Sequence, residues 1–491
     1  MAHDTVIVTE RPSGESLPLA AFRDRLSTHL TGGGRLLTLF ATPAPGAEGF
    51  VTHAVLLEAG RGLAHLAARL PAGDPFPSLT PAHPQLHCFE RELHEQHGIP
   101  VPGHPWLKTI RFEGRNLGQT HDYPFYHLAG KEVHEVAVGP IHAGVIEPGH
   151  FRFMCHGETV HHLEIHLGYQ HRGAEALLAG SPLGRLGPLV ESVAGDTAIA
   201  HAVAFCRAWE ALCGVEVSSE VEAVRGLALE LERVAMHLVG LGGLATDVAF
   251  LPGSATYGRL RTAVINLTMR LCGSRFGRGW FRPGQLRFRF GPAQREDVLK
   301  TLADVRRDIA LINDLFGKSR SVRHRLAGTG VVPTPLAREL GLVGLAGRAS
   351  GLPCDLRTEL GGVAYAVAPV PLVTEAGGDC LARAVVRMRE IDESIAWAIR
   401  VAEVLPVVAG EPPLTARPRG GALAVSVEEG WRGEVVHALE TDAEGKVARY
   451  KVQDPSLRNW FGLAQAVRGN AVYDFPICNK SFDLSYCGTD L

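Results

Sequence analysis

Residues 224–241 read VRGLALELERVAMHLVGL, and this stretch decides the main architecture of the chain. Its apolar residues recur every three or four positions, at Val224, Leu227, Leu231, Val234, Leu238 and Leu241. That spacing places them on one face of an α-helix. Residues 294–316 and 381–402 repeat the pattern. A large helical bundle is therefore predicted.

Two segments outside these helices alternate apolar and polar residues, which is typical of strands with one buried face. In residues 162–167, Leu163, Ile165 and Leu167 alternate with polar side chains. Residues 433–440 and 446–452 flank the turn-like sequence TDAEG and predict a β-hairpin. We expect small sheets at both ends of the bundle.

The first part of the chain has a different pattern. From Phe22 to about Leu70 apolar runs alternate with helix-like stretches, which indicates a small α/β unit. Proline and glycine crowd residues 98–105, and a new strand-like start follows near Val133. We predict an α+β chain with an N-terminal domain at 1–127, a linker at 128–136 and a large, mainly helical domain at 137–491.

The composition excludes several classes of protein. The chain has 491 residues, 46% hydrophobic and 21% charged, with a net charge of −3, so no broad basic field would recruit nucleic acid. It has no signal peptide and no apolar run long enough to span a membrane. Nine scattered cysteines indicate reduced, buried thiols in the cytoplasm. Any contact with a membrane is expected to run through partners.

Two groups of motifs resemble known families. Residues 89–114, FERELHEQHGIPVPGHPWLKTIRFEG, with YPF at 123–125, resemble the 30-kDa-type subunit of respiratory complex I. From Gly139 onward, GPIHAGVIEPGHFRF, ELERVAMHLVGLGG, GRASGLPCDLR, GWRGEVVHAL and VQDPSLRNW resemble the large subunit shared by complex I, as its 49-kDa-type subunit, and energy-converting nickel–iron hydrogenases. A fusion of both types is typical of the formate-hydrogenlyase and hydrogenase-4 branch. The resemblance implies the fold of a hydrogenase large subunit.

The nickel ligands of the hydrogenase relatives are missing. Those relatives hold nickel and iron with four cysteines, in the patterns R-x-C-G-x-C-x-x-A-H and D-P-C-x-x-C. Here the matching segments read ESVAGDTAIAH and SFDLSYCGTDL, which place Ala194, Thr197, Ser485 and Gly488 at the ligand positions. A low-valent nickel–iron centre needs soft sulfur ligands, and one neighbouring thiol, Cys487, does not replace four. No metal and no cofactor are therefore predicted for this chain.

Other residues of the family's pocket are retained. Glu147, in the EPG motif, falls where the hydrogenase branch uses a glutamate to carry protons. Four more residues fall on positions that resemble pocket-lining residues: His142, His201, Asp355 and Arg432. The resemblance implies a cavity with titratable groups but without the metal.

The quinone ligands of complex I are not matched, because Ile146 falls at the histidine position and Gly195 at the tyrosine position. Other donors, such as His142 or Thr197, remain an alternative for a quinone.

Asp196 has two interpretations. A buried Asp196 beside Glu147 would titrate near neutral pH, since like charges in a low dielectric raise one pKa. Alternatively, Asp196 and Thr197 cap the helix whose apolar run begins at Ala198.

The histidines of residues 150–171 allow a zinc site or, more simply, a polar strand face, because neither a cysteine pair nor HExxH accompanies them.

The implied function is that of an oxidoreductase-complex subunit. Its partners would be a small subunit bearing a [4Fe–4S] cluster and antiporter-like and anchoring subunits in the membrane. The chain would sit peripherally on the cytoplasmic side of the cell membrane and couple electron transfer to proton or ion translocation. A catalytically silent scaffold is the main alternative. Quinone reduction and hydrogen turnover are less favoured.

Overall fold

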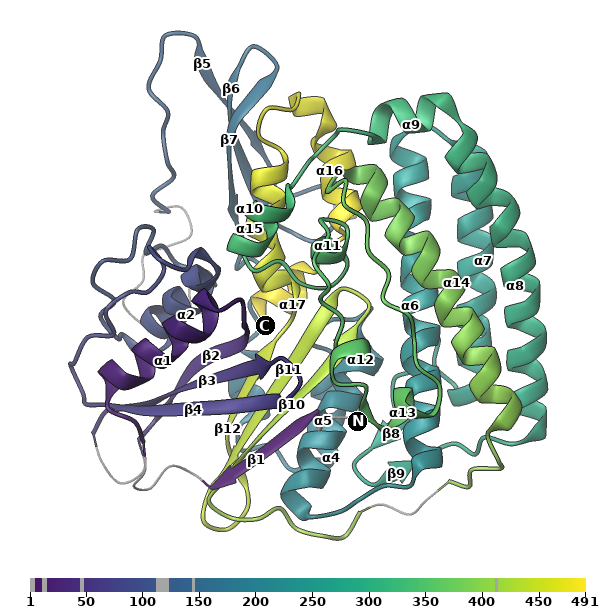
Figure 1. The fold of residues 1–491 in the computed structure, drawn as a ribbon, viewed down its shortest axis with the longest axis horizontal. Coiled ribbons are helices and arrows are strands. Elements are labelled where there is room, and N and C mark those ends of the chain that lie inside the picture. The colour runs from purple at the N-terminus through teal and green to yellow at the C-terminus, as the bar shows by residue number, and fades with distance from the viewer. Residues whose placement is uncertain (1–4, 11–15, 45–47, 112–122, 144–145, 411–413) are drawn as a thin grey trace.

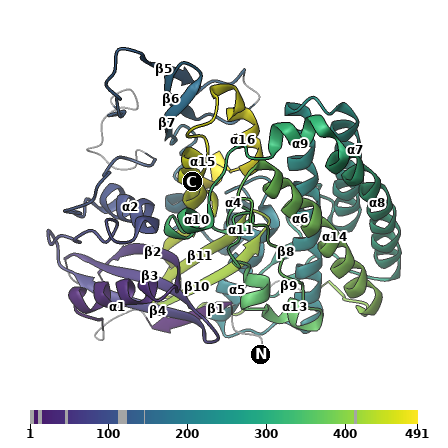
Figure 2. The ribbon, with the colours of Figure 1, turned by 45° about the horizontal axis from the view of Figure 1, so that its top comes forward.

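The computed structural model describes residues 5–10, 16–44, 48–111, 123–143, 146–410 and 414–491. Its largest part is a bundle of long helices that stand side by side (Figures 1 and 2). These are α6 (Ser219–Asp247), α7 (Leu251–Cys272), α8 (Pro292–Lys318) and α14 (Cys380–Val404). The three stretches predicted to be helical lie in α6, α8 and α14, so the bundle prediction is confirmed.

Helix α6 is the core of this bundle. It begins at Ser219 because the Ser218 side chain accepts a hydrogen bond from the Val221 N–H, as an N-cap residue does. Most of its side chains are buried, and it contacts α7, α14 and α16 (Phe475–Phe482). It therefore passes through the protein interior and positions charged residues there.

A four-stranded antiparallel sheet lies beside the bundle, with strand order β1-β10-β11-β12. Its strands are β1 (Val6–Glu10), β10 (Ala422–Gly430), β11 (Gly433–Thr441) and β12 (Val447–Gln453). The pairing of β11 with β12 confirms the predicted hairpin. Helix α5 (Ala198–Cys213) packs on β10 and β11. Every residue of these two strands is buried, because both faces of the sheet are covered.

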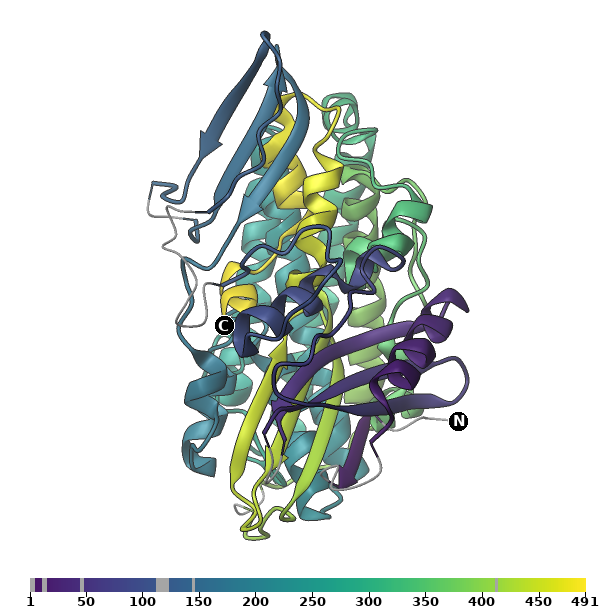
Figure 3. The same ribbon diagram turned by 90° about the vertical axis from the view of Figure 1, so that its left-hand side faces the viewer.

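The second cover of this sheet is the N-terminal unit (Figure 3). Its own sheet has the order β2-β3-β4, from β2 (Arg35–Pro43), β3 (Phe50–Glu58) and β4 (Gly62–Leu70). Helices α1 (Leu19–Thr31) and α2 (His87–His97) belong to the same unit. Phe40 and Val55 pack against Val425 and Val436 of the larger sheet. Strand β1 precedes this unit in sequence but pairs with β10, more than 400 residues later, at Val6 with Ser426.

A third sheet stands at one end of the molecule, with strands β5 (Val133–Val138), β6 (His150–His156) and β7 (Thr159–His166) (Figures 1 and 3). Strand β7 confirms the alternating segment predicted there. The C-terminal helices α15 (Ser456–Ala466), α16 and α17 (Tyr486–Asp490) lie between this sheet and the bundle (Figure 1).

Short elements complete the described chain: α3 (Ala174–Leu178), α4 (Leu183–Val190), β8 (Phe281–Arg282), β9 (Gln285–Leu286), α9 (Arg320–Leu326), α10 (Thr334–Glu339), α11 (Gly344–Arg348), α12 (Leu356–Glu359), α13 (Gly362–Val367) and the 3₁₀ turns Pro84–Leu86 and Val472–Asp474. Across the described ranges, no helix is both long and apolar enough to cross a membrane.

Candidate functional site

Two segments far apart in sequence meet at the start of α5 and α17. Residues 194–197 precede α5, and residues 485–488 begin α17. The Arg172 guanidinium ties them together by donating hydrogen bonds to the carbonyls of Ser192 at 2.8 Å, Val193 at 3.0 Å and Cys487 at 3.1 Å. The fold therefore brings together the two segments that carry the four positions predicted to correspond to the nickel ligands.

The side chains at these four positions have other tasks. Ala194 has a buried methyl group. The Thr197 hydroxyl accepts a hydrogen bond from Arg432 at 3.1 Å. The Ser485 hydroxyl caps α17 by accepting the Gly488 N–H at 2.9 Å. None of them presents a free donor of electrons to a metal, and among the described residues no group of three His, Cys, Asp or Glu side chains could hold a metal ion.

Asp454 fills the space where a fourth ligand would point. A Cβ added at Gly488 would lie 2.6 Å from the carboxyl carbon of Asp454 and 2.9 Å from the Ser485 hydroxyl oxygen. Real Cβ atoms do not approach other heavy atoms so closely. A cysteine at 488 would therefore clash with the buried Asp454 carboxylate. Polar groups therefore occupy the space beside Gly488, which is one of the positions predicted to correspond to a nickel ligand.

The central ion pair of the site joins Asp196 to Arg432. The guanidinium donates to both carboxylate oxygens, at 2.7 and 2.6 Å, and also lies 3.9 Å above the Trp431 ring. The Trp431 indole N–H binds the Asp196 carbonyl at 2.9 Å. The Arg432 side chain is 5% exposed and that of Asp196 is 38% exposed. The two-pronged geometry fixes the carboxylate, and Asp196 raises the pKa of Arg432 above its ordinary value despite burial.

The capping interpretation of Asp196 and Thr197 is wrong. Thr197 stands at the N-cap position of α5, but its side chain makes no capping hydrogen bond. The Glu232 carboxylate from α6 does this instead, accepting the N–H groups of Ile199 at 2.8 Å and Ala200 at 3.3 Å. The Thr197 and Asp196 side chains are held by Arg432, so they cannot turn back to the helix.

Glu232 is a buried carboxyl group whose pKa is raised to about 8. Burial is the main cause, and the charge of Asp196 adds to it, while the two backbone N–H groups oppose it. A group with such a pKa can take up and release a proton near neutral pH. Glu232 lies directly under the Asp196 turn, so its protonation responds to that charge.

Glu147 reaches the same place from the loop before β6. Its side chain is half-buried and contacts the Cys487 thiol, which also meets the Gly195 backbone. Burial, with the nearby charge of Glu147, raises the pKa of Cys487 to about 11. This thiol is therefore protonated at neutral pH.

The other residues of the predicted pocket are distributed differently. The His142 ring shares a hydrogen bond with the Gly149 carbonyl at 2.9 Å, and no described contact joins it to Asp196 or Arg432. Ile146, at the quinone histidine position, has a side chain that is 44% exposed. Gly195, at the tyrosine position, lines the cleft described below. The structure therefore joins Asp196 to Arg432 and places Glu147 against Cys487, whose thiol meets the Gly195 backbone next to Asp196, whereas no described contact links His142 to this group.

His201 belongs to a buried chain of polar groups that begins under the site. Asp454 contacts the His201 ring at 3.5 Å, and His201 shares a hydrogen bond with His437 at 2.9 Å. His437 in turn shares one with the Tyr450 hydroxyl at 2.8 Å. Burial is the main cause that lowers the pKa of His437 well below its ordinary value, so this ring is neutral at neutral pH and has one N–H donor and one acceptor nitrogen. Tyr450 lines a cavity of about 390 Å³ beside the N-terminal unit.

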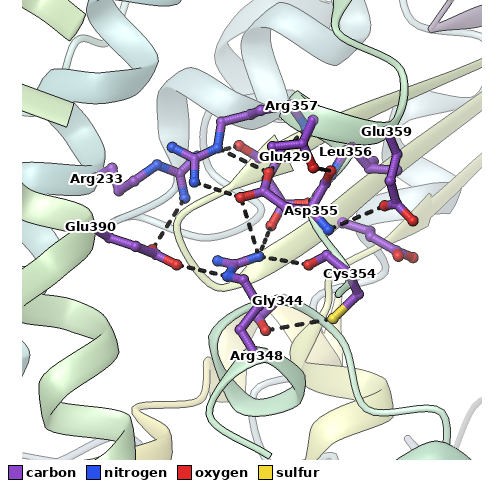
Figure 4. A network of polar contacts seen from close by, with 12 residues as sticks. Arg233, Gly344, Arg348, Cys354, Asp355, Leu356, Arg357, Glu359, Glu390 and Glu429 are labelled. Carbon is purple, nitrogen blue, oxygen red and sulfur yellow. Dashed lines mark hydrogen bonds and ion pairs between the residues drawn. The ribbon is translucent and has the colours of Figure 1, made fainter. Parts of the chain in front are cut away.

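Asp355 lies in a separate buried network (Figure 4). It accepts hydrogen bonds from Arg357 at 3.0 and 2.6 Å and lies 3.8 Å from Arg348. Arg348 also pairs with Glu390 at 2.6 Å and Glu429 at 2.7 Å. These charges are paired and fully buried, so their first role is to fix the chain. The placement of Asp355 as a pocket-lining residue is therefore not supported by its contacts.

This network still supports the site from behind. Arg233 of α6 donates to the carbonyls of Gly430 at 3.1 Å and Glu429 at 2.8 Å. These carbonyls belong to the last two residues of β10, directly before the turn that carries Trp431 and Arg432 between β10 and β11. The buried ion pairs thus hold the turn that presents Arg432 to Asp196.

An open cleft of about 680 Å³ lies beside the ion pair. It is lined by Gly195, Asp196, Met236, Val239, Arg261, Ser274, Arg275, Phe276, Arg278 and Asp483. The three arginines make its rim positive, and the two carboxyl groups lie on the side of the former metal site. The cleft gives Asp196 access to solvent or to a partner.

The fold is that of a large subunit of the complex I and hydrogenase class. Residues 33–124 match the family "Respiratory-chain NADH dehydrogenase, 30 Kd subunit", and residues 247–419 match the family of the 49 Kd subunit. The chain is therefore a fused member of these two subunit families. This confirms the resemblance that the sequence motifs indicated.

Relatives come from both branches. Hydrogenase-4 component G of Escherichia coli is 28% identical over 440 residues, covering 84% of this chain and 76% of the relative. Membrane-bound hydrogenase subunit alpha of Pyrococcus furiosus is 28% identical, covering 72% and 87%. An NADH-quinone oxidoreductase subunit of Geobacillus thermodenitrificans is 28% identical, covering 71% and 95%. The relatives are thus subunits of oxidoreductase complexes.

A solved structure shares the fold. A chain of the membrane-bound sulfane sulfur reductase, described as an archaeal respiratory membrane complex, superimposes with a TM-score of 0.69 over 74% of this chain and all of that chain, at 22% identity. This likeness confirms the fold class, α+β with a helical bundle and small sheets.

Several residues of the site were not predicted. Glu232 and Asp454 sit inside the motifs ELERV and VQDPS. His437 and Tyr450 lie diagonally on the two strands of the predicted hairpin, where His437 is paired with Val452 and Tyr450 with Leu439. A charged residue on the buried side of an otherwise apolar helix is a usable signal for Glu232. Asp454, His437 and Tyr450 could not be identified from the sequence, because their contacts form only where α5, β11 and β12 pack together.

Proposed function

We propose that this chain is the peripheral large subunit of a membrane-associated, respiratory-type oxidoreductase complex that works without a nickel–iron centre. In this complex it couples electron transfer from an iron–sulfur partner to proton or ion translocation. The observation that carries the proposal is that titratable groups surround the positions predicted to correspond to the nickel ligands. Asp196 is fixed by Arg432, Asp454 fills the fourth ligand position, and Glu147 and Glu232 border the same turn.

The role of the site would be to take up and release protons as the electron carrier beside it changes charge. Glu232 has a pKa near neutrality, and its value depends on the charge of Asp196. A change of charge near Asp196 would therefore shift a proton on or off Glu232. The chain Asp454, His201, His437 and Tyr450 offers a route from the site toward the cavity beside Tyr450.

The partners follow from the class. The positive cleft beside Asp196 suits a small subunit bearing a [4Fe–4S] cluster, and antiporter-like and anchoring subunits would hold the assembly on the cytoplasmic side of the membrane. Within the chain we assign residues 1–127 to docking, 128–136 to a linker and 137–491 to the domain of the large-subunit type. The chain itself is assigned neither a cofactor nor a metal.

A quinone is less well supported. Of the two alternative donors, the Thr197 hydroxyl is already bound to Arg432, and the His142 ring is bound to the Gly149 carbonyl. Neither points a free donor at the cleft. The silent scaffold is the second candidate, because the residues at the nickel positions are structural.

Purification of the native assembly through a tag on this chain tests the proposal. The expected result is copurification of an iron–sulfur subunit and integral membrane subunits, with iron present and nickel far below one atom per chain. Absence of both kinds of partner would overturn the assignment. Stoichiometric nickel would instead favour hydrogen turnover.

A further inference from the structure

Two cysteines that are nearly 100 residues apart meet inside the protein. Cys380 is the first residue of α14, and Cys478 lies in α16, and both are fully buried. A Cβ added at Gly330 would lie 2.7 Å from the Cys478 sulfur and 3.3 Å from the Cys380 sulfur. The two thiols are hydrogen-bonded to each other. Their sulfur atoms therefore crowd one small space beneath the Gly330 backbone.

The surroundings make the two thiols unequal. Cys380 lies at the N-terminus of a 25-residue helix, where the helix dipole favours a negative charge. The Arg383 guanidinium also lies 3.5 Å from its sulfur. Although burial opposes ionisation, these contacts and the Cys478 hydrogen bond lower the pKa of Cys380 to about 6. The pKa of Cys478 is raised well above its ordinary value, first by the bond to Cys380.

The seven other cysteines lack this arrangement. Burial raises the pKa of each: Cys88, Cys155, Cys206, Cys213, Cys272, Cys354 and Cys487. They behave as protonated, unreactive thiols at neutral pH. The combination of a thiolate and a neighbouring thiol is what distinguishes a redox pair from a buried apolar cysteine.

We propose that Cys380 and Cys478 form a redox-active dithiol, with Cys380 as the attacking thiol and Cys478 as the resolving thiol. The oxidant class is a low-molecular-weight disulfide. The Cys380 thiolate attacks one of its sulfurs and releases one small thiolate. The Cys478 thiol then loses its proton to that released thiolate, and its sulfur attacks the Cys380 sulfur and expels the second small thiolate. Two electrons pass from the protein pair to the external disulfide.

Access requires only local opening. The sulfurs lie beneath Gly330, and residues 327 and 328 just before it are exposed. The Gly330 N–H binds the Asn470 side chain at 3.2 Å, and its carbonyl accepts Arg383 at 2.8 Å. Breaking these two bonds would uncover the thiols while the bundle stays folded. Oxidation is therefore expected to be slow.

The cross-link would reach the site described above. It would join the start of α14 to α16, whose end is followed by Asp483. The Asp483 carbonyl accepts a hydrogen bond from Arg432, and Arg383 and Arg387 both bind Ser481. Oxidation would thus fix the segment that supports Arg432. This inference does not depend on the proposed function.

The test uses the full-length chain in its native assembly. The protein is equilibrated with mixtures of reduced and oxidised glutathione, quenched with acid, unfolded and alkylated, and its peptides are identified by mass spectrometry. The expected result is loss of two of the nine thiols in a single step, with a peptide pair linked between Cys380 and Cys478. The linkage should disappear on reduction.

Three variants sharpen the test. In Cys478→Ser the reaction should stop at a glutathione adduct on Cys380, and in Cys380→Ser neither adduct nor cross-link should form. Cys272→Ser changes a buried, isolated cysteine and should leave the cross-link unchanged. Free alkylation of both Cys380 and Cys478 at every glutathione ratio in the wild-type protein would overturn the proposal. So would a stable glutathione adduct on wild-type Cys380.

Discussion

The Arg432 guanidinium holds the Asp196 carboxylate through two hydrogen bonds, at 2.7 and 2.6 Å, across a fold that separates the residues by 236 positions. The same guanidinium donates to the Thr197 hydroxyl at 3.1 Å. A fixed charge pair therefore occupies the turn before α5, at positions where the family resemblance predicts nickel ligands.

Replacing Asp196 by asparagine should lower the free energy of unfolding and disrupt the site at the same time. Arg432 is buried and would lose its only carboxylate partner among the described ion pairs. Loss of one partner of a buried pair costs roughly 3–5 kcal/mol, but Asp196 is 38% exposed, so we expect about 1–2 kcal/mol. Urea unfolding of Asp196→Asn measures this. Asp304→Asn, which removes an exposed pair with Arg307, should change stability by less than about 0.5 kcal/mol.

A cysteine introduced at position 488 should destabilise the folded protein for steric reasons. Its Cβ would lie 2.6 Å from the Asp454 carboxyl carbon, so we expect Gly488→Cys to cost about 1–3 kcal/mol through overpacking. Combining it with Asp454→Ala should cost less than the sum of the two single changes. Thermal or urea unfolding of the double-mutant cycle measures this coupling. Strict additivity would show that Asp454 does not fill the position.

Stability should fall as pH rises because of Glu232. Its folded pKa is about 8 against an ordinary value of 4.5, so the folded state keeps a proton that the unfolded state has lost between these pH values. The unfolded state binds fewer protons there, and the free energy of unfolding must decrease through that window. Unfolding of Glu232→Gln across pH 4.5 to 8 should show a flatter profile than wild type. Glu216→Gln, at an exposed site, should not alter the slope.

Tyr450→Phe should interrupt the polar chain that leaves the site. The phenylalanine keeps the ring but removes the hydroxyl group that is hydrogen-bonded to His437 at 2.8 Å. If this chain carries protons, turnover of the assembly should fall about tenfold or more, with a larger solvent deuterium isotope effect. The loss of one buried hydrogen bond should cost about 1–2 kcal/mol of stability. Tyr473→Phe, at a residue that is 61% exposed, is the matched control and should leave both properties unchanged.

The fold could largely be predicted, but one strand could not. The apolar spacing in 224–241, 294–316 and 381–402 identified α6, α8 and α14 because a helix face that packs on a core must repeat every three to four residues. Strand β1 pairs with β10 more than 400 residues away. The sequence of a short strand does not specify the strand with which it pairs, since pairing depends on which sheet edge the rest of the folded chain leaves unpaired.

Residues of the site could be predicted only where they lie in sequence motifs of the related families. Asp196 and Arg432 form an ion pair and Glu147 contacts Cys487 close by, whereas His142 and Asp355 make their contacts elsewhere. Glu232 and Asp454 were not foreseen, because their roles depend on burial and on contacts across elements. A pKa shift of the kind seen for Glu232 is a property of the folded interior and cannot be read from one residue's neighbours in sequence.

The most direct test of the central claim is electron-transfer turnover of the native assembly carrying Glu147→Gln. Viologen-linked activity and subunit content are measured together, with exposed Glu158→Gln as the matched control. If the metal-free pocket handles protons, Glu147→Gln should lose most of the activity while every subunit stays assembled. Full activity in Glu147→Gln, equal to that of Glu158→Gln, would contradict the claim and support a silent scaffold.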